Sequence, residues 1–168
     1  MWGADLSRYE RADKRTDRVV ALRWITNYEA VEKREGVLAD FYSRWQHEGV
    51  VVNQWLTVQG RRPDVDCVES VQALMTHPAF DWRNPNKLRA LIGAFAGANP
   101  IAFHREDGAG YRLMGEVIER LQASNPQIAA RMLAPMTRWR RYAVGQDAMR
   151  AELERLAAID PLPKDVFE

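Results

Sequence analysis

The chain has 168 residues, of which 46% are hydrophobic and 28% charged, and its formal net charge at pH 7 is +1. A chain of this size and composition can bury its own core, so we expect a single globular domain over residues 1–168. A net charge near zero argues against a protein whose overall field recruits it to nucleic acid or to a membrane surface.

The cysteine count and the hydropathy pattern bear on the cellular compartment. Cys67 is the only cysteine, so the chain cannot form an internal disulfide, which favours a reducing compartment. Residues 1–5 contain no apolar run of signal-peptide length, and no stretch approaches the roughly 18 consecutive apolar residues that span a bilayer. We therefore expect a cytoplasmic protein.

The N-terminal region predicts one weak and one firm helix. Residues 4–15 are mostly charged and are expected to form one or two weak helical turns. Thr16 has the character of an N-cap, and Asp17 follows where a negative charge suits the helix dipole. Residues 19–28 are apolar on more than one side, which predicts that this first helix lies centrally in the fold.

The next two segments also predict helices. Residues 35–47 carry a one-sided apolar stripe, and Gly36 predicts a break between a short turn and the main helix. Residues 50–58 are rich in valine, which favours strands. The sequence offers no second strand-like segment to pair with this one, and a lone strand leaves its backbone groups unpaired, so helix is the prediction.

A loop and a short helix come next. Gly60 to Asp64 is the clearest loop, and either Asp64 or Asp66 is expected to cap the helix that follows. His77 ends that helix, because it precedes a proline and such residues avoid the helical region.

Three Asn-Pro pairs organise the central stretch: Asn84-Pro85, Asn99-Pro100 and Asn125-Pro126. An asparagine oxygen can accept a hydrogen bond from the first turn of a helix, and proline at the next position has no N–H to leave unpaired. Each pair therefore predicts a helix start. The apolar residues after each pair recur at three- and four-residue spacing, as one buried helix face requires.

The C-terminal region predicts one more complete helix, with Met149, Leu153 and Leu156 on one face. Residues 159–163 break it, and residues 164–168 resemble the opening of another helix that is cut short. The chain is therefore expected to be all-α with about eight helices. Stacked antiparallel helical hairpins, forming an α-solenoid-like (HEAT/ARM-like) superhelix segment, are the predicted architecture.

The residues with catalytic potential do not form a complete enzyme motif. His47 and Glu48 begin an H-E-x-x-H zinc pattern, but Val51 stands where the second histidine should be, so we predict no metal site in this chain. His77 and His104 are expected to be turn histidines, and Cys67 a small buried residue.

Two further patterns allow alternatives. The glycines in residues 106–111 precede a helix, but the phosphate-binding fingerprint is incomplete, so a turn capped by Asp107 is expected. Residues 138–142 interleave arginines with aromatics. This stretch fits a helix C-terminus, where cations are favoured, but also a protein-interaction surface or a single-stranded RNA site.

Sequence spacing gives only a weak indication of function for three polar residues: Gln127, Arg131 and Arg89. Gln127 and Arg131 are four residues apart and so share a helix face, and Arg89 lies on the helix that starts at Pro85. Spacing alone predicts that all three are solvated polar positions.

An ordered set of short sequences resembles the C-terminal part of bacterial aminopeptidase N, a zinc-dependent alanyl aminopeptidase. The resemblance spans nearly the whole chain. The matching pieces are Thr16-Asp17-Arg18, Phe41-Tyr42, Trp45-Gln46, His77-Pro78-Ala79-Phe80, residues 84–95, Asn99-Pro100, Ala102-Phe103-His104, Asp107-Gly108, Gly110-Tyr111-Arg112, Asn125-Pro126-Gln127, Ala130-Arg131, Met149-Arg150-Ala151 and Leu153-Glu154.

The resemblance implies a function that the residues alone do not. In that family an all-helical C-terminal domain covers the active-site cavity, and this chain resembles about its later half. Gln127, Arg131 and Arg89 would then line the substrate cavity. The zinc ligands and the general base lie in the family's catalytic domain, so zinc would belong to the parent enzyme and this chain alone is expected to be inactive.

Three partner hypotheses follow. As a domain, the chain would contact the catalytic and preceding domains of a parent aminopeptidase and its peptide substrates, without nucleic acid or membrane. As an alternative, it would be a free-standing adaptor that binds proteins along a solenoid surface. As an isolated fragment, it is expected to self-associate through its N-terminal helices.

Overall fold

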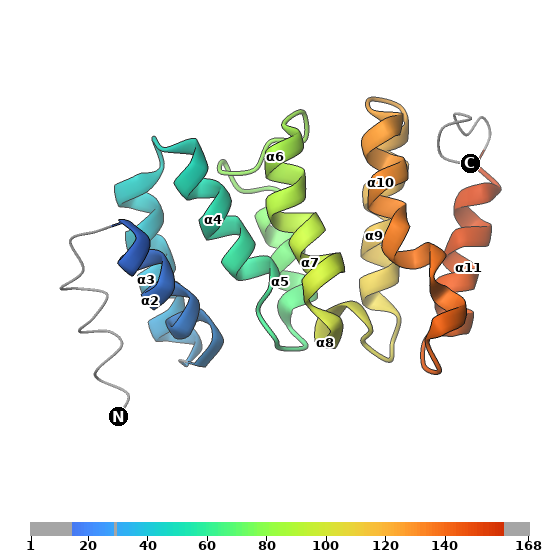
Figure 1. Ribbon diagram of the computed structural model, residues 1–168, viewed down its shortest axis with the longest axis horizontal. Coiled ribbons are helices and arrows are strands. Elements are labelled where there is room, and N and C mark those ends of the chain that lie inside the picture. The colour runs from blue at the N-terminus through green and yellow to red at the C-terminus, as the bar shows by residue number, and fades with distance from the viewer. Residues whose placement is uncertain (1–14, 29, 160–168) are drawn as a thin grey trace.

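The computed structural model describes residues 15–28 and 30–159, and these residues form an array of helices stacked along one axis (Figure 1). No strand occurs among them, which confirms the all-α prediction. The elements are α2 (Arg15–Tyr28), α3 (Val31–Trp45), α4 (Gly49–Gly60), α5 (Cys67–Leu74), α6 (Pro85–Leu88), the π-helix η1 (Arg89–Gly93), α7 (Ala94–Ala98), α8 (Pro100–Phe103), α9 (Ala109–Gln122), α10 (Pro126–Thr137), the 3₁₀ helix η2 (Trp139–Arg141) and α11 (Gln146–Ala157).

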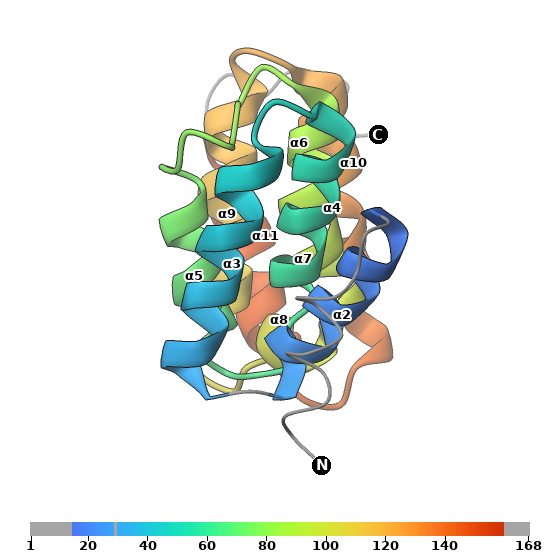
Figure 2. The ribbon, with the colours of Figure 1, turned by 90° about the vertical axis from the view of Figure 1, so that its left-hand side faces the viewer.

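The helices form two layers, which the end-on view separates (Figure 2). One layer holds α4, the continuous run α6–η1–α7, and α10; the other holds α3, α5 and α9. Short loops join α3 to α4 and α9 to α10, and each of these pairs packs side by side. Stacked helical hairpins of this kind are the predicted solenoid-like architecture.

The three Asn-Pro helix starts are confirmed. The side-chain oxygen of Asn84 accepts from the backbone N–H of Asn86 at 2.9 Å. That of Asn99 accepts from Ala102 at 3.2 Å, and that of Asn125 from Ile128 at 3.2 Å. In each case the proline occupies the first turn, where its missing N–H leaves no donor unpaired.

Asn99 also connects two helices that are far apart in the sequence. Its side-chain amide donates to the carbonyl oxygens of Gly60 at 3.1 Å and Arg62 at 2.6 Å, at the end of α4. Asn99 is buried. Because water does not reach this place, the Asn99 amide satisfies carbonyl groups that would otherwise be left without a hydrogen-bond donor. The start of α8 is thereby held against the end of α4.

The core lies between the two layers and receives apolar side chains from nearly every helix. The predicted apolar face of α9, formed by Tyr111, Met114, Val117, Ile118 and Leu121, is buried throughout. Burying one such side chain is worth about 1.5–3 kcal/mol, so this face fixes how α9 packs. The largest fully buried side chains are Tyr111, Phe41, Phe95, Phe103, Leu22, Leu56, Leu88, Leu91, Ile92, Leu113 and Met114.

A π-helical turn interrupts the helix that starts at Asn84, and the sequence did not predict it. The backbone N–H of Ala94 donates to the carbonyl of Arg89, five residues earlier. The wider turn faces α4 at a glycine: a Cβ on Gly60 would lie 2.7 Å from the carbonyl oxygen of Leu91. Because only a glycine allows this approach, α4 and η1 pack backbone to backbone.

Three local predictions were wrong. Thr16 lies inside α2, which already includes Arg15, so it is not the N-cap. The α3 helix continues through Gly36 without a break, and its buried residues Val37, Leu38 and Phe41 follow the glycine directly. The Asp66 side chain makes no capping hydrogen bond, and that of Asp64 is paired with Arg62 and Arg34 instead.

The predicted central position of the first helix was also wrong. Helix α2 lies at one end of the described array and packs against α3 and α4 (Figure 1). Ala21 and Leu22 are buried there, whereas Val20 is 54% exposed. The predicted weak turn at residues 4–15 and the short helix at residues 164–168 lie outside the described residues, except for Arg15.

Candidate functional site

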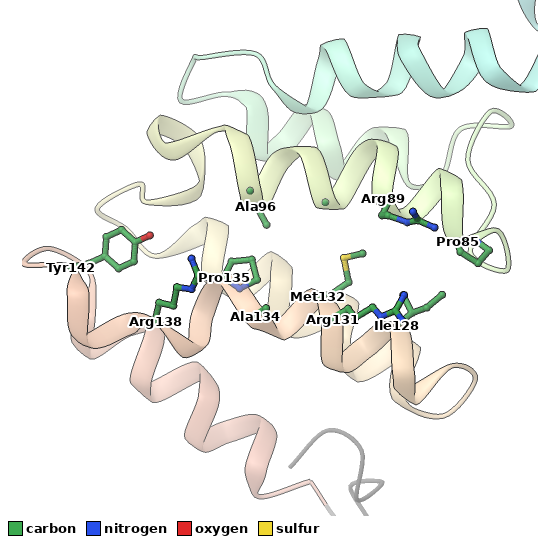
Figure 3. Close-up of a pocket in the computed structure, with 12 residues that line it drawn as sticks. Pro85, Arg89, Ala96, Ile128, Arg131, Met132, Ala134, Pro135, Arg138 and Tyr142 are labelled. Carbon is green, nitrogen blue, oxygen red and sulfur yellow. The ribbon is translucent and has the colours of Figure 1, made fainter. Parts of the chain in front are cut away.

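A groove of about 440 Å³ runs between the η1–α7 segment and α10. Figure 3 shows its two walls, which come from neighbouring helices of the same layer. Its volume lies within the range of about 300–1,000 Å³ that small-molecule and cofactor sites occupy. The lining residues are Pro85, Arg89, Gly93, Ala96, Gly97, Ile128, Arg131, Met132, Ala134, Pro135, Arg138 and Tyr142.

Two of the three residues implied by the resemblance meet in this groove. Arg89, at the start of η1, and Arg131, on α10, lie on opposite walls near the same end (Figure 3). Gln127 is exposed at the start of α10 and is not one of the lining residues. Their role in binding a ligand stays a prediction.

The backbone of η1 and α10 shapes the groove between the two arginines. Gly93 lies beside the Arg89 stem, since a Cβ there would be 3.7 Å from Arg89 Cγ and 4.0 Å from Met132 Cε. The absence of a side chain at Gly93 keeps the floor open between Arg89 and Met132. Pro135 has no N–H, so it cannot donate to the carbonyl of Arg131 one turn earlier in α10.

The groove is cationic with an apolar floor. Three arginines line it, Arg89, Arg131 and Arg138, and among the described residues no aspartate or glutamate lines it. The Arg89 guanidinium donates to the neutral Asn86 side chain at 3.4 Å. Guanidinium groups arranged this way favour an anionic ligand, and carboxylates fit their paired donors well.

At the opposite end of the groove, Tyr142 connects the lining to the core (Figure 3). Its ring lies 4.2 Å from the ring of His104, measured between centroids. His104 Nδ1 in turn shares a hydrogen bond of 2.8 Å with the hydroxyl of the buried Tyr111. Burial lowers the pKa of His104 and raises the pKa of Tyr111, so both side chains are neutral near pH 7.

The sequence did not lead us to expect Arg138, Gly93 and Gly97 at the groove. Their spacing from Arg131 and Arg89 does, however, indicate that they share helix faces with these residues. Arg138 follows Arg131 by seven residues, which is two helical turns. Gly93 and Gly97 follow Arg89 by four and eight residues, along one face. The interpretation of Arg138 as a cation at a helix C-terminus is confirmed as well, because α10 ends at Thr137.

The other candidate residues make hydrogen bonds that support the fold. The thiol of Cys67 donates to the carbonyl of Gln59 at 3.3 Å, and burial raises the pKa of this thiol to about 11, which disfavours the nucleophilic thiolate. His77 Nδ1 accepts from the backbone N–H of Ala79 at 3.1 Å. Asp107 accepts from the N–H of Ala109 at 3.0 Å, so the predicted turn is capped as expected.

Within residues 15–28 and 30–159, no three side chains of His, Cys, Asp or Glu come together in a way that could hold a metal ion. In the same part of the chain, no helix combines the length and the apolar character needed to cross a membrane.

The chain is similar to known proteins over nearly its whole length. The chain is 45% identical over 161 residues to aminopeptidase N of Haemophilus influenzae, which covers 95% of this chain and 18% of that protein. It is 37% identical over 162 residues to aminopeptidase N of Escherichia coli, covering 96% of this chain and again 18% of the relative. The chain thus spans about a fifth of the length of the relatives it matches.

A solved structure shares the fold. The crystal structure of Legionella pneumophila aminopeptidase A in complex with aspartic acid matches with a TM-score of 0.92 and 32% sequence identity, covering 98% of this chain and 19% of that one. The resemblance to aminopeptidase N that the sequence carries is therefore confirmed at the level of the helical domain. A family model described as "Domain of unknown function (DUF3458_C) ARM repeats" matches residues 3–168. The chain belongs to this family of ARM-repeat helical domains.

Proposed function

We propose that this chain is a non-catalytic helical domain of a zinc aminopeptidase, and that it forms one wall of the cavity through which peptides reach the metal. Arg89 and Arg131 would contact the peptide, and the remaining helices would hold the groove rigid. Zinc, its ligands and the general base would be supplied by another part of the parent protein, and the isolated chain would not hydrolyse a peptide.

The observation that carries this proposal is the position of the groove. The resemblance to aminopeptidase N implies that Arg89 and Arg131 face the substrate cavity, and in this fold both line a single groove of about 440 Å³. The two arginines are 42 positions apart in the sequence, so a shared site depends on how the η1–α7 segment packs against α10. The relatives, all aminopeptidases in which this region makes up about a fifth of the chain, support the same assignment.

The proposal is tested by Arg131→Ala in the full-length polypeptide that contains this domain. Removing one exposed guanidinium contact is expected to raise KM or change the ranking of peptide substrates by about three- to tenfold, with an unchanged zinc content. Arg61→Ala is the matched control, because Arg61 is also exposed but does not line the groove.

Steady-state kinetics on a panel of peptides, together with metal analysis, provides the measurement. Kinetics that match the parent enzyme on every peptide would remove Arg131 from the cavity wall. Hydrolysis of an alanyl amide by a pure sample of the 168-residue chain would contradict the non-catalytic role.

A further inference from the structure

We infer that Gly60, at the end of α4, is a positioning residue for peptide binding: its backbone contact with the π-turn η1 directs Arg89 into the groove. The inference rests on the proposed function, in which Arg89 contacts the peptide. It adds a residue that acts on the peptide only through Arg89, because Gly60 itself is not one of the groove's lining residues.

The π-turn sets the direction in which Arg89 faces. The backbone N–H of Ala94 donates to the carbonyl of Arg89, so this turn holds one residue more than a turn of α-helix. One residue of an α-helix corresponds to a rotation of about 100° around the helix axis. If the turn closed to regular α-helix, Arg89 would rotate by about that angle relative to Gly93 and Ala96, which line the groove after it.

The side chain of Arg89 is held mainly by this backbone. Its guanidinium donates to Asn86 Oδ1 at 3.4 Å, and both residues are exposed. A hydrogen bond this long between exposed groups fixes a side chain only weakly. The Arg89 stem lies over Gly93, where a Cβ would be 3.7 Å from Arg89 Cγ, and the side chain extends into the groove from the η1 wall (Figure 3). Its placement therefore follows the shape of η1.

Gly60 contacts the π-turn on its buried side. A Cβ on Gly60 would lie 2.7 Å from the carbonyl oxygen of Leu91 and 3.4 Å from the backbone nitrogen of Phe95. Leu91 and Phe95 are both 0% exposed. Backbone atoms in a close-packed core cannot turn aside as the end of a side chain can, so a methyl group on residue 60 would have to displace the turn.

Asn99 holds the same end of α4 in place. Its side-chain amide donates to the carbonyl oxygens of Gly60 at 3.1 Å and Arg62 at 2.6 Å. Asn99 follows α7 directly, so the helical run that begins at Pro85 contacts the end of α4 at two points, at η1 and at Asn99. The end of α4 is thereby kept against the π-turn.

The test is Gly60→Ala in the full-length polypeptide that contains this domain. The added methyl group is expected to displace η1, and Arg89 with it. KM for peptides should then rise by about three- to tenfold with little change in kcat, as the loss of a binding contact predicts. Steady-state kinetics on a panel of peptides gives the measurement, and an unchanged zinc content and circular dichroism spectrum show that the variant is folded.

A double-mutant cycle with Arg89→Ala separates positioning from a general loss of packing. If Gly60 acts only through Arg89, adding Gly60→Ala to Arg89→Ala should change KM by less than about twofold. Gly115→Ala is the matched control, because Gly115 is also a buried glycine within a helix but faces Glu152 and does not line the groove. The control is expected to leave KM unchanged.

Asn99→Ser provides a second variant in case Gly60→Ala does not fold. Serine is also a good N-cap, so the first turn of α8 keeps an acceptor, whereas the amide that holds the Gly60 carbonyl is lost. This variant is expected to raise KM by about two- to fivefold, as the loss of one or two hydrogen bonds predicts. The rise should disappear when Arg89 is replaced by alanine.

The outcomes are distinguishable. An unchanged KM in folded Gly60→Ala would overturn the inference, as would additive effects of Gly60→Ala and Arg89→Ala. A rise in KM in Gly115→Ala as large as that in Gly60→Ala would also overturn it, since any loosening of the fold would then have the same effect. Each of these results leaves the wall function standing. An Arg89→Ala enzyme with the KM of the parent on every peptide would count against the wall function as well.

Discussion

At the scale of single residues, burial sets the protonation state of two histidines, His77 and His104. His104 is half-buried between the core and the groove, held by the Tyr111 hydroxyl at 2.8 Å and by the ring of Tyr142. Burial lowers its pKa, and it also lowers the pKa of His77. Both imidazoles are therefore neutral in the folded protein at pH 7, and they act as packing groups and hydrogen-bonding partners.

These two pKa shifts predict how stability depends on pH. A histidine whose pKa is lower in the folded state binds a proton more readily when unfolded, so stability falls as the pH drops below the unfolded value of about 6.5. We expect a lower urea midpoint at pH 5.5 than at pH 7.5. His104→Phe, which keeps a ring against Tyr142, is expected to reduce this difference.

Chemical denaturation at the two pH values measures the effect. His77 contributes in the same direction, so the difference should shrink in His104→Phe without vanishing. His47→Gln is the control, because His47 is exposed in the turn that follows α3. A His104→Phe protein with the same pH dependence as the unaltered chain would show that His104 does not contribute.

At the scale of helices, glycines set the closest approaches. Gly115 on α9 faces Glu152 on α11, and a Cβ at this position would overlap the Glu152 carboxylate. Glu152 is buried, and its carboxylate accepts from Arg155 Nε at 2.8 Å; Arg155 also pairs with Glu119 of α9 at 2.9 Å. The contact between α9 and α11 therefore depends on a missing side chain and on a charged pair that fills the space.

Gly115→Ala is expected to destabilise the fold by about 1–3 kcal/mol, because the added methyl forces Glu152 away from Arg155. Gly36→Ala is the matched control: Gly36 also lies within a helix, but a Cβ there meets nothing within 4 Å. Alanine is the better helix former, so this change should stabilise α3 by about 0.5–1 kcal/mol. Urea denaturation of both variants checks the sign, and a neutral Gly115→Ala would mean that the Glu152 side chain can turn aside at little cost.

At the scale of the whole molecule, the stack of hairpins has two ends. Helix α2 lies at one end and α11 at the other (Figure 1). An end helix of such a stack lacks one neighbour, so its outward face has no helix to cover it within the described array. Val20 on α2 is 54% exposed, consistent with this position.

The isolated chain is predicted to self-associate through the α2 end. Sedimentation equilibrium over a concentration series should show a mass that rises with concentration, and Val20→Lys should weaken the association because it places a charge on an exposed apolar position of α2. Val144→Lys, at a residue 60% exposed beside α11, is the control for the opposite end. A monomer at all concentrations would contradict the prediction.

The sequence by itself determined the three Asn-Pro helix starts, the buried face of α9 and the family. Asn84, Asn99 and Asn125 each act through a hydrogen bond to their own first turn, which is local, and the burial of the α9 face follows from side-chain spacing within one helix. Local rules of this kind can be read without knowing what lies nearby in space. The same applies to the resemblance to aminopeptidase N, which depends on an ordered series of short matches.

Only the tertiary structure decided where the helices lie and what the groove contains. Three features depend on contacts between segments distant in the sequence. They are the position of α2 at an end of the array, the π-turn at Arg89, and the placement of Arg89 and Arg131 on opposite walls of one groove. Gly60 against Leu91 shows the reason: the close approach of α4 and η1 is a property of two backbones meeting, and neither segment alone encodes it. A binding surface between two helices likewise exists only once both are packed.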